Sequence, residues 1–441
     1  MLRSSASSAP PASPASPASP ASPASLATAT SRTARPLGFR EFLLLVAAMQ
    51  VCQAIAIDAM LPALPTIARA LNVTDPNRAQ WVVMAYMAGI GFGQLLWGML
   101  SDRFGRRRIL LIGLALYAVG AFLSSLTTDF STLLMWRFVD GLAAASTVVA
   151  RSVIRDLYSG HQMARVMSLT FIVFLMSPVL APSLGQLLLL VAPWRFLFVL
   201  FGTFGTLVWL WVLLRLPETL HAEHRRDLGR KQLQRAAMLV LGNRISLGYT
   251  LAIAFMMGCL FAYLGMVQQI FGQVFHRPTL MPTMFALCAL SMGAASYLNS
   301  RYVARLGMVA ISQAGVLLLV LVTLAQVLLA TFGHEGMATF VALQAATLAC
   351  VGLTVGNFGA LAMETMGAVA GIAASLQGFI STLGAALLGV VIGYGFHGSV
   401  LPLALGSAAC GIAGLLFVLL AEKGRLFRPQ RRPVAMAVAG E

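Results

Sequence analysis

Three ionisable residues lie inside long apolar stretches of the sequence, where charged side chains are uncommon. Asp58 falls in the first such stretch, and Arg137 and Asp140 fall in the fourth. A charge at the centre of a lipid bilayer costs about 2.5–3.5 kcal/mol, so residues of this kind usually serve function. Burial favours the neutral form of an aspartate, whereas a nearby arginine favours the carboxylate, so small helix movements can shift a proton on or off. Asp58 and Asp140 are therefore candidates for proton uptake and release, and Arg137 is the candidate for the charge that controls it.

Each candidate also has a structural interpretation. Arg137 and Asp140 are three positions apart and share one helix face, so Asp140 is either a second titratable site or the neutralising partner of Arg137. Asp58 is either a proton carrier or a cap for the helix break expected at Pro62 and Pro65. The residue pattern leaves both alternatives open.

A second group of charges separates two apolar runs. Asp102, Arg103, Arg106, Arg107 and Arg108 lie within LLWGMLSDRFGRRRILLIG. An aspartate at the end of a helix is unfavourable beside the negative end of the helix dipole, unless cations or the start of another helix offset it. Such a placement can make a contact with two states that differ by a few kcal/mol, a difference that a ligand can overcome. The alternative, that the arginines only anchor the topology, is what we expect of Arg107 and Arg108.

The elements that position these charges are apolar helices. The 441 residues are 59% hydrophobic and 10% charged, with a mean hydropathy of +0.84. Apolar runs of about 20 residues recur, each long enough to cross a hydrocarbon core of about 30 Å as a helix. We predict an all-α polytopic membrane protein with twelve transmembrane helices in two pseudo-symmetric six-helix bundles. The predicted segments are 42–64, 80–100, 109–126, 132–154, 167–191, 196–216, 246–270, 279–298, 307–331, 337–362, 370–394 and 400–421.

The spacing of the segments predicts the domain organisation. Residues 1–38 form an Ala/Ser/Pro-rich tail with too few large apolar side chains to fold, so we expect it to be disordered and cytoplasmic. The charged stretch after the second segment is weakly repeated after the eighth segment, in YLNSRYVARLG. This internal repeat suggests duplicated halves around a central cavity. The other predicted parts are an N-terminal six-helix bundle at 39–216, a basic cytoplasmic linker at 217–244, a C-terminal six-helix bundle at 245–421 and a basic cytoplasmic tail at 422–441.

The distribution of charge and of reactive residues excludes several function classes. The net charge is +16, but basic residues gather in alternate loops, which predicts cytoplasmic termini rather than binding of nucleic acid. The five cysteines are scattered through apolar runs, so we expect no metal site. The only lysines, Lys231 and Lys423, lie outside any phosphate-binding loop motif, so we expect no ATP. No catalytic pairing stands out, and we predict that the protein is not an enzyme and has no cofactor.

Several ordered motifs resemble one family over about residues 40–425. GMLSDRFGRRRIL is similar to the signature between helices two and three of the major facilitator superfamily. DAMLPALPTIARAL, WRFVDGLAAASTVVARSVIRDLY and SPVLAPSLGQ resemble the first-, fourth- and fifth-helix motifs of its twelve-helix drug:proton antiporters. PETL, LGNRISLGYTL and AMETMGAVAGIAASLQGF are similar to the bicyclomycin-resistance (Bcr/CflA) branch.

The resemblance implies roles for particular residues. Proton coupling would fall to Asp58, Arg137 and Asp140, although the family pattern has glutamine at position 140. The conformational latch would comprise Gly98, Asp102, Arg103, Gly105 and Arg106.

The fifth-helix motif, which marks antiporters in the family, would act through Pro178, Pro182 and Gly185. In that motif Gln186 replaces a usual glycine, and simple helix packing is the alternative.

Polar side chains inside the apolar segments are candidates for a substrate cavity. Interhelical hydrogen bonding is an equally good explanation for any one of them. The candidates are Gln53, Tyr86, Tyr263, Gln268, Asn357 and Gln377.

The predicted function is secondary active transport. The resemblance implies proton-coupled efflux of drugs or other amphipathic small molecules by alternating access, with the proton as the coupling ion. The alternative is a proton-coupled exporter of one metabolite, such as a sugar or an amino acid, because fold and motifs do not determine the substrate. We expect a monomer in a bacterial inner membrane, with the lipid bilayer and a small-molecule substrate as its partners.

Overall fold

The computed structural model describes residues 38–158, 160–220, 230–333, 335–366 and 369–427, and within these ranges every regular element is helical. Eleven helical stretches are long and apolar enough to cross a membrane. A further long helix, α7, is apolar over Met176–Val191. This confirms the predicted fold class. The tail at 1–37, most of the linker at 221–229 and the end of the chain at 428–441 lie outside the described residues.

Helices α1 to α8 form the first half of the chain, in which two of the predicted segments are interrupted. The first breaks at η1 (Leu61–Ala63), and the fourth breaks at η3 (Ala145–Val148). The helices are α1 (Phe39–Asp58), α2 (Leu64–Ala70), α3 (Trp81–Phe104), α4 (Arg106–Leu126), α5 (Phe130–Ala144), α6 (Val149–Leu157), α7 (Gly160–Val191) and α8 (Arg195–Arg215).

Helices α9 to α15 form the second half. Within it, α10 continues into a short π-helical turn at Ile270–Val274. The helices are α9 (Arg230–Gly242), α10 (Arg244–Gln269), α11 (Met281–Leu306), α12 (Met308–Thr331), α13 (Met337–Met363), α14 (Ala370–Tyr394) and α15 (Leu401–Ala421).

The same glycine turn occurs once in each half. Gly105 ends α3 with φ +101° and ψ 151°, and Gly307 ends α11 with φ +84° and ψ 145°. A positive φ suits glycine and stops a helix, so α4 and α12 restart in a new direction. Counting back from each glycine, Asp102 corresponds to Ala304, so the second half keeps the turn but not the acid.

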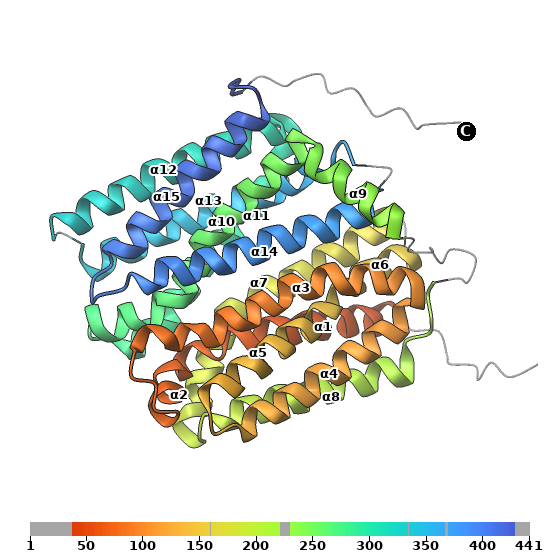
Figure 1. Cartoon of the computed structure of the whole chain (residues 1–441), viewed down its shortest axis with the longest axis horizontal. Helices are drawn as coiled ribbons and strands as arrows, with labels where there is room; N and C mark the ends of the chain where they lie inside the picture. Colours follow the sequence, from red (N-terminus) through yellow and green to blue (C-terminus); the bar gives the residue numbers. More distant parts are fainter. Residues whose placement is uncertain (1–37, 159, 221–229, 334, 367–368, 428–441) are drawn as a thin grey trace, which may run out of the picture. The chain divides into compact units, whose positions relative to one another are not determined.

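The two halves meet along two helix pairs, α3 with α14 and α7 with α11 (Figure 1). Small residues allow close contact along the first pair. Gly91 packs against the backbone of Leu383, and Gly98 packs against the hydroxyl of Ser375. Helices joined through small residues can slide without large side chains colliding.

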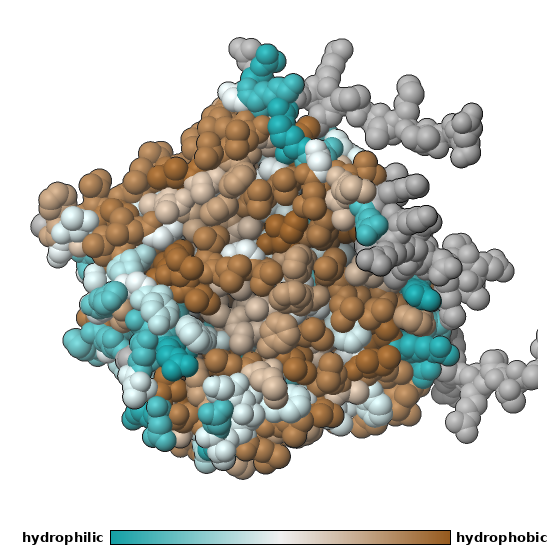
Figure 2. All heavy atoms as spheres, viewed as in Figure 1, coloured by the Kyte–Doolittle hydropathy of each residue, from teal (hydrophilic) through white to brown (hydrophobic). Residues whose placement is uncertain are grey.

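Polar residues gather at the ends of the helices, whereas the visible flank across α12, α15, α14 and α3 is mainly apolar (Figure 2). Large apolar side chains such as Leu190, Val191 and Leu214 are exposed. An exposed apolar surface of this kind is stable in lipid rather than in water. The helices therefore span a membrane.

Candidate functional site

Asp58 is the last residue of α1, and its side chain is buried. Only 5% of the residue is exposed, and its carboxylate makes no hydrogen bond or ion pair with another described residue. The short helix η1 that follows it has no side-chain cap, so the interpretation of Asp58 as a cap at the Pro62 break has no support in the geometry. Asp58 is thus a buried carboxyl group without a counter-charge among the described residues.

Arg137 is fully buried and connects α5 to two neighbouring helices. Its guanidinium donates to the carbonyl of Ala56 at 2.8 Å and to that of Val82 at 3.3 Å. It also lies over the ring of Tyr86, with its central carbon 4.2 Å from the ring centroid. The arginine therefore reaches the backbone two residues before Asp58 without pairing with the carboxylate of Asp58.

Asp140 provides the counter-charge of Arg137. Its Oδ2 lies 3.8 Å from Nη1 of Arg137 and accepts a hydrogen bond of 3.3 Å from the hydroxyl of Ser124. Its Oδ1 and Nη1 of Arg137 are buried and have no hydrogen-bond partner. A pair at this distance, with unused hydrogen-bonding capacity on both partners, is loosely held.

The latch residues converge at the end of the bundle where α3 turns into α4. Arg106 forms an ion pair with Asp102, donates to the hydroxyl of Ser101 at 2.8 Å and forms a second ion pair with Asp156 at 3.2 Å. The backbone N–H of Arg106 donates to Glu218 at 2.8 Å. Arg106 is thus bound by three acidic side chains, and we call this end of the helices the latch end.

Asp102 also lies beside the start of α14 in the other half. A Cβ placed on Gly371, the second residue of α14, would be 3.7 Å from Oδ2 of Asp102. The positive end of that helix dipole offsets the unfavourable position of the aspartate at the end of α3. Asp102 therefore belongs to both the intra-half ion pair and the contact between the halves.

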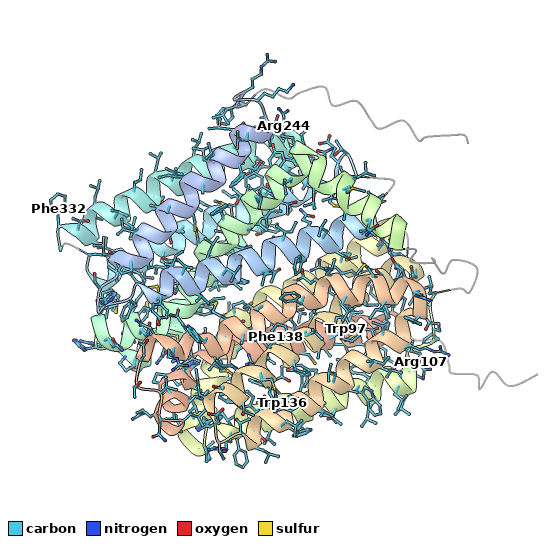
Figure 3. The ribbon with its side chains drawn as sticks, viewed as in Figure 1. Trp97, Arg107, Trp136, Phe138, Arg244 and Phe332 are labelled. Carbon is cyan, nitrogen blue, oxygen red and sulfur yellow. The ribbon has the colours of Figure 1, made fainter. Side chains whose placement is uncertain are left out.

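The remaining latch candidates have packing roles. Gly98 packs on Ser375, and a side chain at Gly105 would collide with the carboxylate of Glu218. Arg103 lies over its neighbour Phe104, with 5.2 Å between guanidinium and ring centroid, and makes no ion pair with a described residue. Arg107, labelled at the latch end in Figure 3, donates to the carbonyl of Leu213 and so holds α4 to α8.

Asp156 and Glu218 are the latch residues that the sequence analysis missed. They lie 50 and 112 positions after Arg106, so spacing along the chain did not connect them. One feature of the sequence could have identified them, namely residue type. Both are acidic residues of the quoted motifs, and both lie close to basic residues in the sequence. Thr219 adds a further hydrogen bond of 3.3 Å to Asp156.

The fifth-helix motif lies on α7, which carries Pro178 and Pro182 in its interior. A Cβ on Gly185 would collide with the backbone carbonyl of Ala59, so only glycine allows α7 to lie this close to α1. Ala59 directly follows Asp58. The motif therefore packs against the chain at the buried carboxyl group.

A cavity of about 600 Å³ lies between the halves. Of the six predicted cavity residues, Gln53 and Gln377 line it, together with the latch residues Gly98 and Asp102. Asp58, Arg137 and Asp140 do not line it.

The other four predicted cavity residues lie away from its wall. Tyr86 donates to the backbone carbonyl of Gln53, and Tyr263 stacks on Phe285 at 5.7 Å between ring centroids. Asn357 and Asn299 exchange hydrogen bonds, and the side-chain oxygen of Gln268 is buried without a partner. Interhelical hydrogen bonding, the alternative explanation, describes Tyr86, which bonds α3 to α1, and Asn357, which bonds α13 to α11.

At the other end of the helices, which we call the far end, polar contacts join the two halves. Asn77 donates to the carbonyl of Phe396 at 3.0 Å and accepts from Gln269 at 3.1 Å. Trp81 and Tyr394 pack with 6.4 Å between their ring centroids. The cavity reaches the latch end, where Arg155 is exposed, while these contacts close the far end.

Comparisons with known proteins agree with this architecture. The sequence profile of the Major Facilitator Superfamily matches residues 46–389. The bicyclomycin resistance protein homolog of Haemophilus influenzae is 30% identical over 268 residues, which cover 60% of this chain and 67% of that protein. The multidrug resistance protein MdtL of Salmonella paratyphi B is 28% identical over 397 residues, which cover 86% and 94% of the two chains.

The fold is also similar to a solved structure, that of a D-xylose-proton symporter. The TM-score is 0.66 at 13% sequence identity, and the match covers 86% of this chain and 97% of the other. Profile, relatives and fold agree with the polytopic helical architecture. The chain belongs to the major facilitator superfamily and is a multi-pass membrane transporter of small molecules, not an enzyme.

Proposed function

We propose that the protein exports drugs or other amphipathic small molecules in exchange for protons, as a member of the Bcr/CflA branch. The proposal is supported by relatives named for bicyclomycin resistance and multidrug resistance. The motifs around Asp58, Arg137 and Pro178 support the antiport direction through their resemblance to drug:proton antiporters.

The observation that carries the proposal is the isolation of Asp58. Arg137 has Asp140 as its counter-charge, whereas Asp58 is buried without one among the described residues. A buried carboxyl group without a counter-charge is stable only when it holds a proton. When helix movement opens its surroundings to water, it can release that proton. Asp58 is therefore the proton carrier.

Substrate and proton are coupled through α1 rather than by sharing one pocket. Gln53 lines the cavity and Asp58, five residues later, does not. Gly185 of α7 packs directly behind Asp58 at Ala59. A substrate that shifts α1 against α7 therefore changes the exposure of the carboxyl group.

Alternating access would use the two ends of the cavity in turn. The contacts of Asn77 close the far end, and separating them would open it while the halves close at the latch. The clustered arginines Arg106, Arg107 and Arg108 at the latch end support a cytoplasmic position for that end and for both termini, in a bacterial inner membrane.

Proteoliposomes with an acidic lumen and a trapped pH dye test the proposal. An amphipathic compound added outside should enter in exchange for protons, so the luminal pH should rise with the wild type and not with Asp58→Asn. Asp129→Asn is the matched control, because Asp129 is an exposed helix cap in the same half and should leave the pH rise intact.

Each other outcome contradicts a defined part of the proposal. An intact pH rise with Asp58→Asn would move the coupling to Asp140. No pH rise in the folded wild type, with a panel of anionic, neutral and cationic compounds, would favour the metabolite carrier.

A further inference from the structure

The cavity wall carries uncompensated positive charge. Among the described residues, three charged side chains line it: Asp102, Arg151 and Arg155. Asp102 has an ion-pair partner in Arg106, which it shares with Asp156. Arg151 and Arg155 lie one turn apart on α6, are exposed, and have no acidic partner within 4.0 Å among the described residues. The free charges that face the cavity are therefore two guanidinium groups.

The amide side chains of the wall add hydrogen-bond donors. The side-chain oxygen of Gln53 accepts from Thr147 at 3.0 Å, and that of Gln94 accepts from Thr382 at 3.4 Å. Each amide is left with an NH₂ group that has no acceptor in the part of the chain described. The NH₂ group of Gln377 is buried and also lacks an acceptor. The wall thus offers hydrogen-bond donors at these three positions.

Much of the remaining wall is apolar and adaptable. It includes Met163 and Met167 from α7, Ile253 from α10, and Val355 and Met363 from α13. Methionine side chains adjust to ligands of different shape. A ligand that satisfies this cavity needs an apolar body as well as a group that accepts hydrogen bonds.

We infer that the substrates are amphipathic organic anions, whose carboxylate, sulfonate or phosphate group binds Arg151 and Arg155 and whose apolar body lies against the methionine-rich wall. The inference rests on the proposed function and names the substrate class of that same cavity. Guanidinium groups suit such anions because their N–H groups can donate two parallel hydrogen bonds to two oxygens. Asp58 lies outside the cavity and does not repel the anion from within it.

Equilibrium binding to the purified full-length protein in neutral detergent tests the inference without requiring transport. The probes are naphthalene-1-sulfonate and its cationic counterpart, 1-naphthyltrimethylammonium, compared by isothermal titration calorimetry. The sulfonate should bind at least tenfold more tightly. Arg151→Gln and Arg155→Gln should each weaken its binding by about tenfold, the effect of one lost charge-assisted hydrogen bond.

Arg301→Gln is the matched control, because Arg301 is an exposed arginine of α11 outside the cavity, and it should bind the sulfonate like the wild type. Equal or tighter binding of the cation, no detectable binding of the sulfonate, or unchanged sulfonate binding in both cavity variants would overturn the inference.

An anionic lipid headgroup would present the same chemistry as a free anion. Titrations in nanodiscs of phosphatidylcholine, with and without phosphatidylglycerol, separate the two sources. Loss of sulfonate binding only when phosphatidylglycerol is present would support the anion site and assign it to lipid; unchanged binding would support a free anion.

The test also separates the inference from the proposed function. Sulfonate binding without a pH rise in proteoliposomes would contradict proton exchange alone. A pH rise with cations in a protein that does not bind the sulfonate would contradict the anion site alone.

Discussion

Gly185 of α7 packs directly on the backbone carbonyl of Ala59, the residue that follows the buried Asp58. The two helices come this close because glycine has no Cβ, and Pro178 and Pro182 lie inside α7 just before the contact. The contact connects a sequence motif on one helix to the carboxyl group at the end of another.

Gly185→Ala should therefore impair both stability and transport. The added methyl group collides with backbone rather than with a flexible side chain, so α1 and α7 must separate, at a cost of about 1–3 kcal/mol. A lower melting temperature and slower proton exchange in proteoliposomes would be measured. Gly356→Ala on α13 is the control, because nothing lies within 4 Å of its new Cβ. Wild-type behaviour of Gly185→Ala would show that the contact is not required.

Arg106→Gln should destabilise the protein more than Arg107→Gln. Removal of the guanidinium of Arg106 leaves Asp102 and Asp156 without their shared cation, which we expect to cost about 1–3 kcal/mol. Arg107 donates to one backbone carbonyl, so its loss should cost less. Thermal unfolding of the two variants in the same detergent measures the difference, and equal melting temperatures would contradict the central role of Arg106.

Asn77→Ala should loosen the closed far end. The variant loses three hydrogen bonds across the halves. The two shorter ones, each worth about 1 kcal/mol, already shift the balance toward opening by more than tenfold. Hydrogen–deuterium exchange of the segment around Phe396 should accelerate. Thr74→Ala is the control, because Thr74 is an exposed residue two positions before the short helix η2 (Pro76–Gln80), which carries Asn77. Equal exchange in both variants would show that other contacts close this end.

Glu335→Gln should stabilise the protein at neutral pH. Burial raises the pKa of Glu335, which lies between α12 and α13, above its usual value, although a hydrogen bond from Gln326 opposes the shift. Because the folded-state pKa exceeds the unfolded one, the ionised group destabilises the fold near pH 7, and this cost disappears as the pH falls through the raised pKa. The melting temperature of the variant should exceed that of the wild type at pH 7 and match it near pH 4. A constant difference at both pH values would exclude this titration.

Local sequence features predicted much of the fold. Solid apolar runs predict transmembrane helices because the bilayer leaves no other way to satisfy the backbone of a continuous apolar segment. The turn at Gly105 is equally local, since the chain there needs a positive φ. The pairing of Arg137 with Asp140 follows from their three-residue spacing on one helix.

The sequence by itself therefore determined the class of fold, the buried charges and the pairing of Asp102 with Arg106, because these depend on neighbours within a few residues. Only the tertiary structure brought Asp156 and Glu218 to Arg106 and left Asp58 without a counter-charge, because those relations join helices far apart in the chain. It alone also placed Arg151 and Arg155 on the cavity wall and Tyr86 and Asn357 away from it. Which face of a helix meets the cavity depends on how the twelve helices pack, and no periodicity within one helix contains that information.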